Sequence, residues 1–170
     1  SGNYTLTITG SGGGVTHSRT IQLTVKPRIT SFTVSPNPFS PNGDGRKDNT
    51  TIKASFTETV SWTLEARNST DYLMRKWTGT GTSLTRIWDG KDSGGNVVPD
   101  GAYKIVLSGT SSSSGIPLAS KRTQTVTVDT ISPAVTDVSV NLSSFKPSLG
   151  ETTTIRYTLS ENCYVTIKIY

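Results

Sequence analysis

The sequence predicts an all-β protein built from antiparallel β-sandwiches. Two observations carry this prediction. Short segments in which apolar and polar residues alternate recur along the chain between turns rich in Gly, Asn and Asp, and such alternation is typical of strands with one face in a core. The chain also repeats itself at a nearly fixed spacing, with length changes confined to loops, as tandem copies of one domain do.

The repeat is out of phase with the ends of the sequence. Five residues of the middle recur 103 positions later, where Ile52, Phe56, Glu58, Trp62 and Leu64 become Ile155, Leu159, Glu161, Val165 and Ile167. Gly2, Tyr4, Leu6 and Ile8 recur 99 positions later as Gly101, Tyr103, Ile105 and Leu107, and Arg19, Thr20, Leu23 and Val25 recur 103 positions later as Arg122, Thr123, Val126 and Val128. We therefore expect one complete unit over 29–130, the last hairpin of a preceding unit over 1–28, and the first strands of a following unit over 131–170.

The first partial unit is expected to be a β-hairpin. Tyr4, Leu6 and Ile8 alternate with threonines over 3–9, and the apolar residues of 20–25 share one face in the same way. The Gly-rich stretch 10–14 supplies the turn. Pro27 then ends the ladder, because proline cannot donate to it, and begins a short linker.

The complete unit contains seven segments with strand character. They are 30–34, 50–56, 60–67, 71–77, 83–88, 102–108 and 122–128. Seven short strands in about 100 residues predict an antiparallel sandwich of the immunoglobulin-like type, in which Trp62 stands where such folds commonly bury an aromatic residue. After a linker at 129–133, the segment from 138 onward is expected to form the first three strands of the next copy.

Two motifs of the complete unit resemble a known family. They are Asn-Pro-Phe-Ser-Pro-Asn-Gly-Asp-Gly-Arg-Lys-Asp at 37–48 and Trp-Asp-Gly-Lys-Asp-Ser-Gly-Gly-Asn-Val-Val-Pro-Asp-Gly-Ala-Tyr at 88–103. Together they resemble the Ig-like domain of flagellar hook-capping proteins (FlgD type), a module also found in tandem in large secreted and surface-attached bacterial proteins. The resemblance implies an extracytoplasmic bacterial sandwich that spaces, anchors or displays other domains. It brings no catalytic residues.

Asn42, Asp44 and Asp48 are the strongest candidates for a metal site. Oxygen ligands at short spacing around glycines are typical of calcium loops, and calcium is the one cofactor that the sequence suggests. In an EF-hand-like register the first position is Ser40 and the twelfth is Thr51, so the bidentate glutamate is missing. We favour the alternative of a tight turn, in which glycines supply positive φ and the side-chain oxygens accept hydrogen bonds from nearby backbone N–H groups.

A second oxygen-rich stretch lies in the other motif. Its members are Asp89, Asp92, Asn96 and Asp100. Turn chemistry accounts for each of them, since Asp-Gly and Gly-Gly-Asn sequences shape connections between strands. The carboxylates of this loop are the only feature of the sequence that supports a metal site there.

The sequence offers little for catalysis, and we expect no enzyme activity. His17 is the sole histidine and lies beside a Gly-rich loop with no nucleophile motif in view. Glu58 and Glu65 can be imagined as paired glycosidase carboxylates, but no cleft-forming insertion accompanies them.

Four aromatic residues are candidates for binding sugar. Trp62, Trp77, Trp88 and Tyr72 would form a stacking platform if they faced outward. Aromatic residues on alternating strands more often belong to the core, which is the interpretation we favour. Burial of all three tryptophans would remove the platform.

Composition limits the partners. The net charge is +5, but the 17 Lys and Arg residues are spread along the chain, whereas nucleic-acid recognition needs a clustered basic footprint. We expect no nucleic-acid partner, and a weak attraction to acidic cell-wall polymer or polysaccharide stays open. No apolar run approaches the roughly 18 residues that a membrane span needs. Cys163 is the single cysteine, so it cannot form a disulfide within the chain, and we expect a small buried or edge residue.

The function that the sequence favours is a non-catalytic spacer, stalk or adhesive assembly module of a secreted or cell-surface bacterial protein. Its partners would be neighbouring Ig-like domains or copies of itself, and prolines in the linkers 26–29 and 129–134 would stiffen it. The alternatives are a carbohydrate or cell-wall binding module and an accessory C-terminal region of a secreted hydrolase. Because the two end segments carry complementary strands, the tail of one molecule could pair with the head of the next and build a fibre by strand addition.

Overall fold

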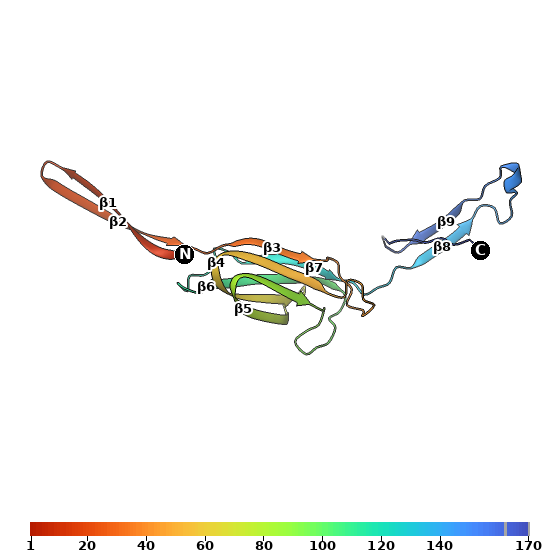
Figure 1. The fold of residues 1–170 in the computed structure, drawn as a ribbon, viewed down its shortest axis with the longest axis horizontal. Coiled ribbons are helices and arrows are strands. Elements are labelled where there is room, and N and C mark those ends of the chain that lie inside the picture. The colour runs from red at the N-terminus through yellow and green to blue at the C-terminus, as the bar shows by residue number, and fades with distance from the viewer. Residues whose placement is uncertain (162, 170) are drawn as a thin grey trace. The chain divides into compact units, whose positions relative to one another are not determined.

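The structure is a computed structural model that describes residues 1–161 and 163–169. These residues form two compact units, one of residues 1–130 and one that begins at Ile131 (Figure 1). In the described part of the chain every regular element is a β-strand, apart from one short 3-10 helix, and the paired strands are antiparallel. The all-β antiparallel prediction is confirmed. No helix among these residues is long and apolar enough to cross a membrane.

The first unit contains seven strands and the second contains two. In the first unit they are β1 (Gly2–Gly12), β2 (Val15–Val25), β3 (Ile29–Ser35), β4 (Thr50–Arg67), β5 (Leu73–Trp88), β6 (Gly101–Ser111) and β7 (Arg122–Val128). In the second unit they are β8 (Val135–Val140) and β9 (Ile155–Leu159), with the 3-10 helix η1 (Pro147–Leu149) between them.

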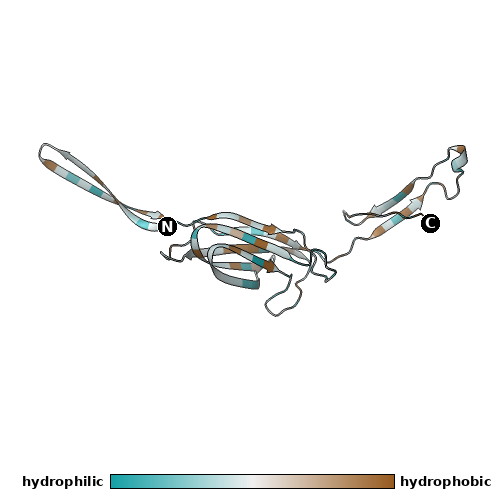
Figure 2. Cartoon of the chain, in the orientation of Figure 1, coloured by the Kyte–Doolittle hydropathy of each residue, from teal (hydrophilic) through white to brown (hydrophobic). Residues whose placement is uncertain are grey.

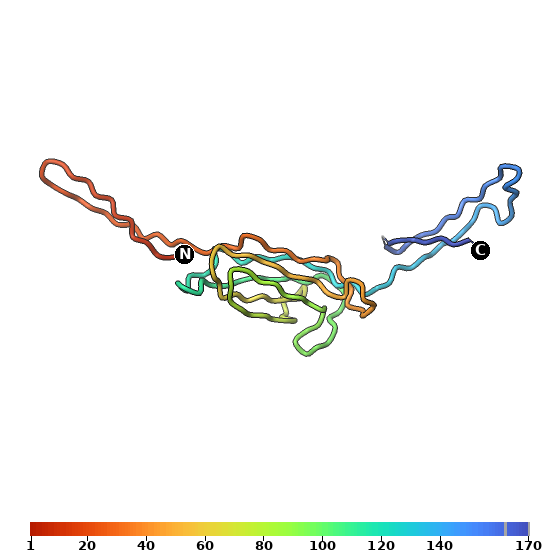
Figure 3. Tube along the Cα trace, viewed as in Figure 1, coloured from red at the N-terminus to blue at the C-terminus, as the bar shows by residue number. Residues whose placement is uncertain are grey.

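The prediction of separate strands at 50–56 and 60–67, and again at 71–77 and 83–88, was wrong. Each pair of segments joins into one long strand, β4 or β5, as the trace shows (Figure 3). The β4–β5 ladder shifts register between Ser55 and Val60, where the chain bends. No Gly or Pro stands at 57–59 to end the strand, so the backbone stays extended through the bend.

The bend turns one set of hydrogen-bonded strands into two layers. The first half of β4 pairs with β3 on one side and with the end of β5 on the other. The second half of β4 pairs with the start of β5 and with β6, which in turn pairs with β7. β5 pairs with β4 alone, so it is the edge strand of both layers.

The core fills the space between the layers. Along β4 the buried residues alternate with exposed ones, because successive side chains of a strand point to opposite faces. The largest fully buried side chains are Trp88, Phe39, Ile52, Leu64, Ile105 and Leu107. Trp88 lies between two other rings, with centroids 5.4 Å from Phe39 and 5.4 Å from Tyr103.

The segment between β3 and β4 closes one side of the sandwich. Phe39 forms a parallel bridge with Val128 of β7, and its backbone N–H donates to the carbonyl of Thr127 at 3.0 Å. The side chain of Asn37 donates to the Thr125 carbonyl and accepts the Thr127 N–H at 2.9 Å. These bonds tie the first motif of the sequence to the last strand of the sandwich.

The N-terminal hairpin has the same register as the last hairpin of the sandwich. The equivalent pairs are Gly2–Val25 and Gly101–Val128, Tyr4–Leu23 and Tyr103–Val126, and Ile8–Arg19 and Leu107–Arg122. The predicted turn at 10–14 is shorter than expected, because β1 continues to Gly12 and only Gly13 and Gly14 form the turn, with φ of 58° and 80°.

The second unit pairs like the first hairpin of the sandwich. The equivalent pairs are Val135–Leu159 and Ile29–Phe56, Ser139–Arg156 and Thr33–Lys53, and Val140–Ile155 and Val34–Ile52. Among its described residues the unit has two strands where the sequence led us to expect three, and the first begins at Val135 instead of 138. Residues 163–169 form no strand, while Asn162 and Tyr170 of the expected third strand lie outside the described residues.

Candidate functional site

The acidic turn at 42–48 is held by hydrogen bonds from backbone to side chain. Both carboxylate oxygens of Asp48 accept backbone N–H groups, from Gly43 at 2.9 Å and from Gly45 at 2.8 Å. Asn42 and Asp44 each accept the N–H two residues further on, at 3.1 Å and 2.7 Å. Gly43 and Gly45 both have φ of 81°, which favours glycine. The geometry has the form of the turn that the sequence favoured.

The same three residues were the candidate calcium ligands. No group of three or more His, Cys, Asp or Glu side chains within reach of one metal ion occurs among residues 1–161 and 163–169. Oxygens of all three side chains already accept bonds from the loop backbone, so a cation would share them with N–H donors. Calcium at this turn stays a prediction.

The second oxygen-rich stretch divides into three separate contacts. Asp92 accepts the backbone N–H groups of Gly94 and Asn96 at 2.8 Å and 2.9 Å, and the bond from Asn96 is the main cause that lowers the pKa of the Asp92 carboxyl. Asp89 forms an ion pair with Arg75 at 3.3 Å. Asp100 accepts the N–H and the hydroxyl of Thr130.

The four aromatic candidates lie in different surroundings. Trp88 is fully buried and its Nε1 donates to the Lys91 carbonyl at 2.9 Å. Trp62 is 4% exposed, with the Arg86 guanidinium 5.1 Å from its ring. Trp77 is half-buried against the core, and Tyr72 is 68% exposed. Two of the three tryptophans are therefore core residues, and the four rings do not form one outward-facing row.

The titratable residues considered for catalysis are dispersed. Glu65 forms an ion pair with Arg67 at 2.8 Å on the second half of β4. Glu58 lies at the bend of the same strand and accepts the Ser1 hydroxyl at 2.7 Å. His17 is exposed on β2, and Cys163 is a half-buried free thiol. We find no contact that joins these groups in the part of the chain that the structure describes.

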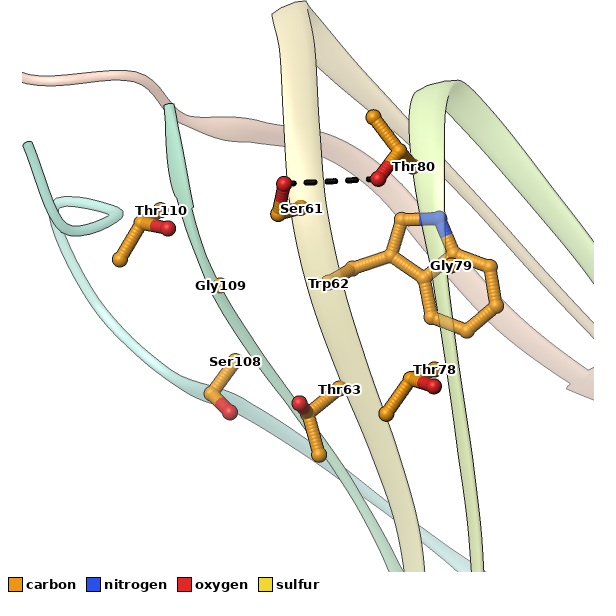
Figure 4. Close-up of a pocket in the computed structure, with 9 residues that line it drawn as sticks. All are labelled: Ser61, Trp62, Thr63, Thr78, Gly79, Thr80, Ser108, Gly109 and Thr110. Atoms are coloured by element: carbon orange, nitrogen blue, oxygen red, sulfur yellow. Dashed lines mark hydrogen bonds between the residues drawn. The ribbon is translucent and has the colours of Figure 1, made fainter. Parts of the chain in front are cut away.

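The structure brings together six hydroxyl-bearing residues that the sequence did not single out (Figure 4). They line an open groove of about 680 Å³ on the outer face of β5, β4 and β6, in two rows across the strands: Thr80, Ser61 and Thr110, then Thr78, Thr63 and Ser108. Gly79 and Gly109, which flank Trp62, form its floor together with that residue. Such a groove can form hydrogen bonds with a ligand that carries many hydroxyl groups.

A signal for this groove was present in the sequence. Each of the three strand segments carries two Ser or Thr residues separated by one residue, namely 61 and 63, 78 and 80, and 108 and 110. Residues two apart share a face of a strand, but only the registers of β4 with β5 and with β6 place the three pairs side by side.

The terminal hairpin presents a large apolar face, which we call the hairpin apolar face. It consists of Tyr4, Leu6, Ile8, Ile21, Leu23 and Val25, which are 47–61% exposed. Brown bands lie between pale or teal bands along this hairpin (Figure 2). Five equivalents in the sandwich, Tyr103, Ile105, Leu107, Val126 and Val128, are 0–4% exposed. The same type of surface is therefore core in one hairpin and open in the other.

The second unit shows the same contrast. Val135, Ile155 and Tyr157 are 39–57% exposed, whereas their equivalents Ile29, Ile52 and Ala54 are 0–9% exposed. Apolar surface of this kind is stabilised when it is covered by other strands.

Comparison with known proteins gives matches among solved structures alone. No protein-family model matches the chain, and no curated protein matches it. Among solved structures the chain is similar to PorZ, an essential bacterial surface component of the type-IX secretion system of Porphyromonas gingivalis, with a TM-score of 0.37 and 18% identity. The match covers 58% of this chain and 11% of PorZ. The resemblance to the FlgD-type Ig-like domain stays a hypothesis.

Proposed function

We propose that the chain is a non-catalytic structural module of a secreted or cell-surface bacterial protein, in which an immunoglobulin-like sandwich of the FlgD type acts as a spacer and assembly element. Its partners are neighbouring sandwiches of the same type or copies of itself. The sequence motifs at 37–48 and 88–103 support the family and the bacterial, extracytoplasmic setting.

One observation carries this proposal. The hairpin that precedes the sandwich in the sequence reproduces the register of its last hairpin pair by pair. The hairpin that follows reproduces three pairs of its first hairpin, with the register shift at a different place along the strands. A repeated sequence does not by itself require that two hairpins pair their strands in the same register. A shift of one strand by a single residue would turn all its side chains to the opposite face of the sheet. Equal registers are what we expect of tandem units that each complete a sandwich.

The junctions of the sandwich support a spacer of limited flexibility. Pro27 is fully buried and its carbonyl accepts the N–H of Ala119 at 2.9 Å. Arg28 and Thr57 exchange two bonds, each of 3.0 Å. At the other junction, Thr130 is held by the Asp100 carboxylate. Both linkers are thus bonded to the sandwich, which resists bending at these points.

Pulling on single molecules tests this proposal. When the chain is stretched between its two ends, we expect one unfolding step in which residues 29–130 reach an extended length of about 350 Å, at 3.3–3.6 Å per residue, so the chain lengthens by that value less the distance between the ends of the folded sandwich. Leu23→Asp is the control, since it changes the hairpin apolar face and leaves that step intact. A chain that extends smoothly, with no unfolding step, would contradict a role as a spacer that resists force.

A further inference from the structure

β1 is open on one edge. Within the described residues its hydrogen-bonded partner is β2, along the whole of Gly2–Gly12. The equivalent strand of the sandwich, β6, has partners on both edges, namely β7 and the second half of β4. An open strand of 11 residues whose apolar face is also exposed is a template for pairing with another chain.

A second segment has the pattern of the missing partner. Residues 163–169 follow 103 positions after 60–66, the part of β4 that pairs with β6. Val165, Ile167 and Ile169 alternate with Tyr164, Thr166 and Lys168, as expected for a strand with one buried face. The three apolar residues are 41–88% exposed, while their equivalents Trp62, Leu64 and Ala66 are 0–4% exposed.

We propose that residues 163–169 add as an antiparallel strand to the open edge of β1 in a second copy of this chain. The register follows from the β4–β6 ladder, which pairs Val60 with Ser111, Trp62 with Gly109 and Leu64 with Leu107. The equivalent pairs between two copies are Cys163 with Gly12, Val165 with Gly10, Ile167 with Ile8 and Ile169 with Leu6. This inference rests on the proposed role as an assembly module and identifies the surfaces that assemble.

The side chains fit this register on both faces. Ile167 and Ile169 meet Ile8 and Leu6 on the hairpin apolar face. The alternate pairs, Lys168 with Thr7 and Thr166 with Thr9, lie on the polar face, where hydroxyl groups already bond across the hairpin. Val165 stands opposite Gly10, as Trp62 stands opposite Gly109, so the space above the glycine is filled in both cases.

The rest of the second unit can cover the same hairpin. Phe145 follows 106 positions after Phe39, the offset that also relates Val140 to Val34. Because Phe39 forms a parallel bridge with Val128 in the sandwich, the equivalent contact between copies joins Phe145 to Val25. In this pairing β3, β4, β6 and β7 of the sandwich each have a counterpart among the described residues. Since β5 pairs with β4 alone and is an edge strand in both layers, its loss interrupts no other strand pairing.

Disulfide trapping tests the register directly. Cys163 is the single cysteine, so oxidation of the wild-type chain stops at dimers. Directly opposite residues of an antiparallel pair have Cα atoms about 4.5–5.5 Å apart, within the range of about 4.4–6.8 Å for a disulfide. Gly12→Cys should therefore yield a ladder of disulfide-linked multimers. Gly12 has open space for the side chain and needs no positive φ.

Ser11→Cys is the matched control, because residue 11 points to the opposite face and faces Tyr164 in the proposed register. We expect the ladder to be lost in this variant. If both variants gave the same ladder of disulfide-linked multimers, the proposed register would be overturned. If Gly12→Cys gave monomers with a disulfide within one chain, pairing with a second copy would be overturned.

A second measurement is the mass of the chain in solution, determined by light scattering with Cys163 kept as a free thiol. The mass of the wild-type chain should rise with concentration, Ile167→Asp should remove that rise, and Lys168→Asp, on the polar face, should keep it. A wild-type mass that stays monomeric at all concentrations would overturn the inference. It would leave the spacer role intact, because the unfolding step of residues 29–130 does not depend on contacts between copies.

Discussion

Two glycines allow close contacts around Trp62, one with its indole ring and one with the backbone beside it. Trp62 lies opposite Gly79 on β5 and opposite Gly109 on β6. A Cβ atom at Gly79 would stand 2.3 Å from Cζ2 of Trp62, and one at Gly109 would stand 2.7 Å from the Ser61 carbonyl oxygen. The absence of a side chain at these two positions lets β5 and β6 lie close to β4 around Trp62.

Replacement of Gly109 by alanine tests this requirement. We expect Gly109→Ala to lower the free energy of unfolding by about 1–3 kcal/mol, because the added methyl meets backbone that cannot move away cheaply. Urea denaturation followed by tryptophan fluorescence is the measurement. All three tryptophans lie in residues 29–130, so this signal reports on the sandwich.

Gly10 provides the control, since it is the equivalent of Gly109 in the N-terminal hairpin and a methyl group added to it would meet nothing within 4 Å. Gly10→Ala should change the free energy of unfolding by less than about 0.5 kcal/mol. If the two substitutions changed the free energy of unfolding equally, the close contact at Gly109 would not contribute to the stability of the sandwich.

At the scale of elements, loops of the sandwich are ordered by their own acidic side chains. Asp48 closes the turn at 42–48, Asp92 closes the turn at 92–96, and Asp100 holds the linker at Thr130. The turn at 42–48 lies between β3 and β4, which pair with each other, so a well-defined turn there helps to set their register. The oxygens that suggested metal binding act here as acceptors for backbone N–H groups.

Asp48→Ala tests the role of the first loop. We expect the free energy of unfolding to fall by about 1–3 kcal/mol, because two backbone N–H groups lose a charged acceptor. Asp48→Asn is the matched variant and should lose less, since its amide oxygen can still accept. Urea denaturation measures both.

Calcium addition separates the two interpretations of this loop. We expect the melting temperature of the wild-type chain to stay the same with calcium or with a chelator, because N–H donors already engage the Asp48 oxygens. A melting temperature that rises with calcium, and does so only while Asp48 is intact, would establish the metal site instead.

At the scale of the whole molecule, equivalent hairpins are found in two states. β6 and β7 are inside a closed sandwich, whereas β1 and β2 keep the same register with their apolar face exposed. The difference between them is the set of strands that covers each one. The hairpin apolar face is therefore expected to tolerate charge that its buried equivalent cannot.

Aspartate at equivalent positions tests this expectation. Val126→Asp places a carboxylate in the core and should leave the sandwich unfolded or strongly destabilised in the urea experiment. Leu23→Asp, at the equivalent position of the hairpin, should leave the sandwich as stable as in the wild-type chain. Loss of stability in Leu23→Asp would mean that the hairpin is covered by the sandwich itself.

Much of the fold could be predicted from the sequence because strand character is local. Alternation of apolar and polar residues marked the strands around Tyr4, Trp62 and Tyr103, and Gly and Asn marked the turns. The interpretation of Trp62 as a core residue is confirmed by its 4% exposure. The boundary between 56 and 60 was misplaced, because the polar residues there resemble a turn although the backbone stays extended.

The candidate site was less predictable than the fold. The turn bonds of Asn42, Asp44 and Asp48 follow from residue types a few positions apart, so sequence reasoning could reach them. The hydroxyl groove is formed by residues of three strands that are far apart in the sequence. The residues of a single segment do not indicate with which other strands that segment pairs.

The all-β class, the repeated pattern of residues and the chemistry of the turns can be inferred from the sequence alone, because they depend on backbone preferences and on the two-residue period of a strand. The joining of predicted strands into bent β4 and β5, the exposure of Tyr72 and the different burial of equivalent hairpins depend on the tertiary structure. Burial depends on which strands come to lie opposite one another, and that is a property of long-range pairing rather than of any single segment.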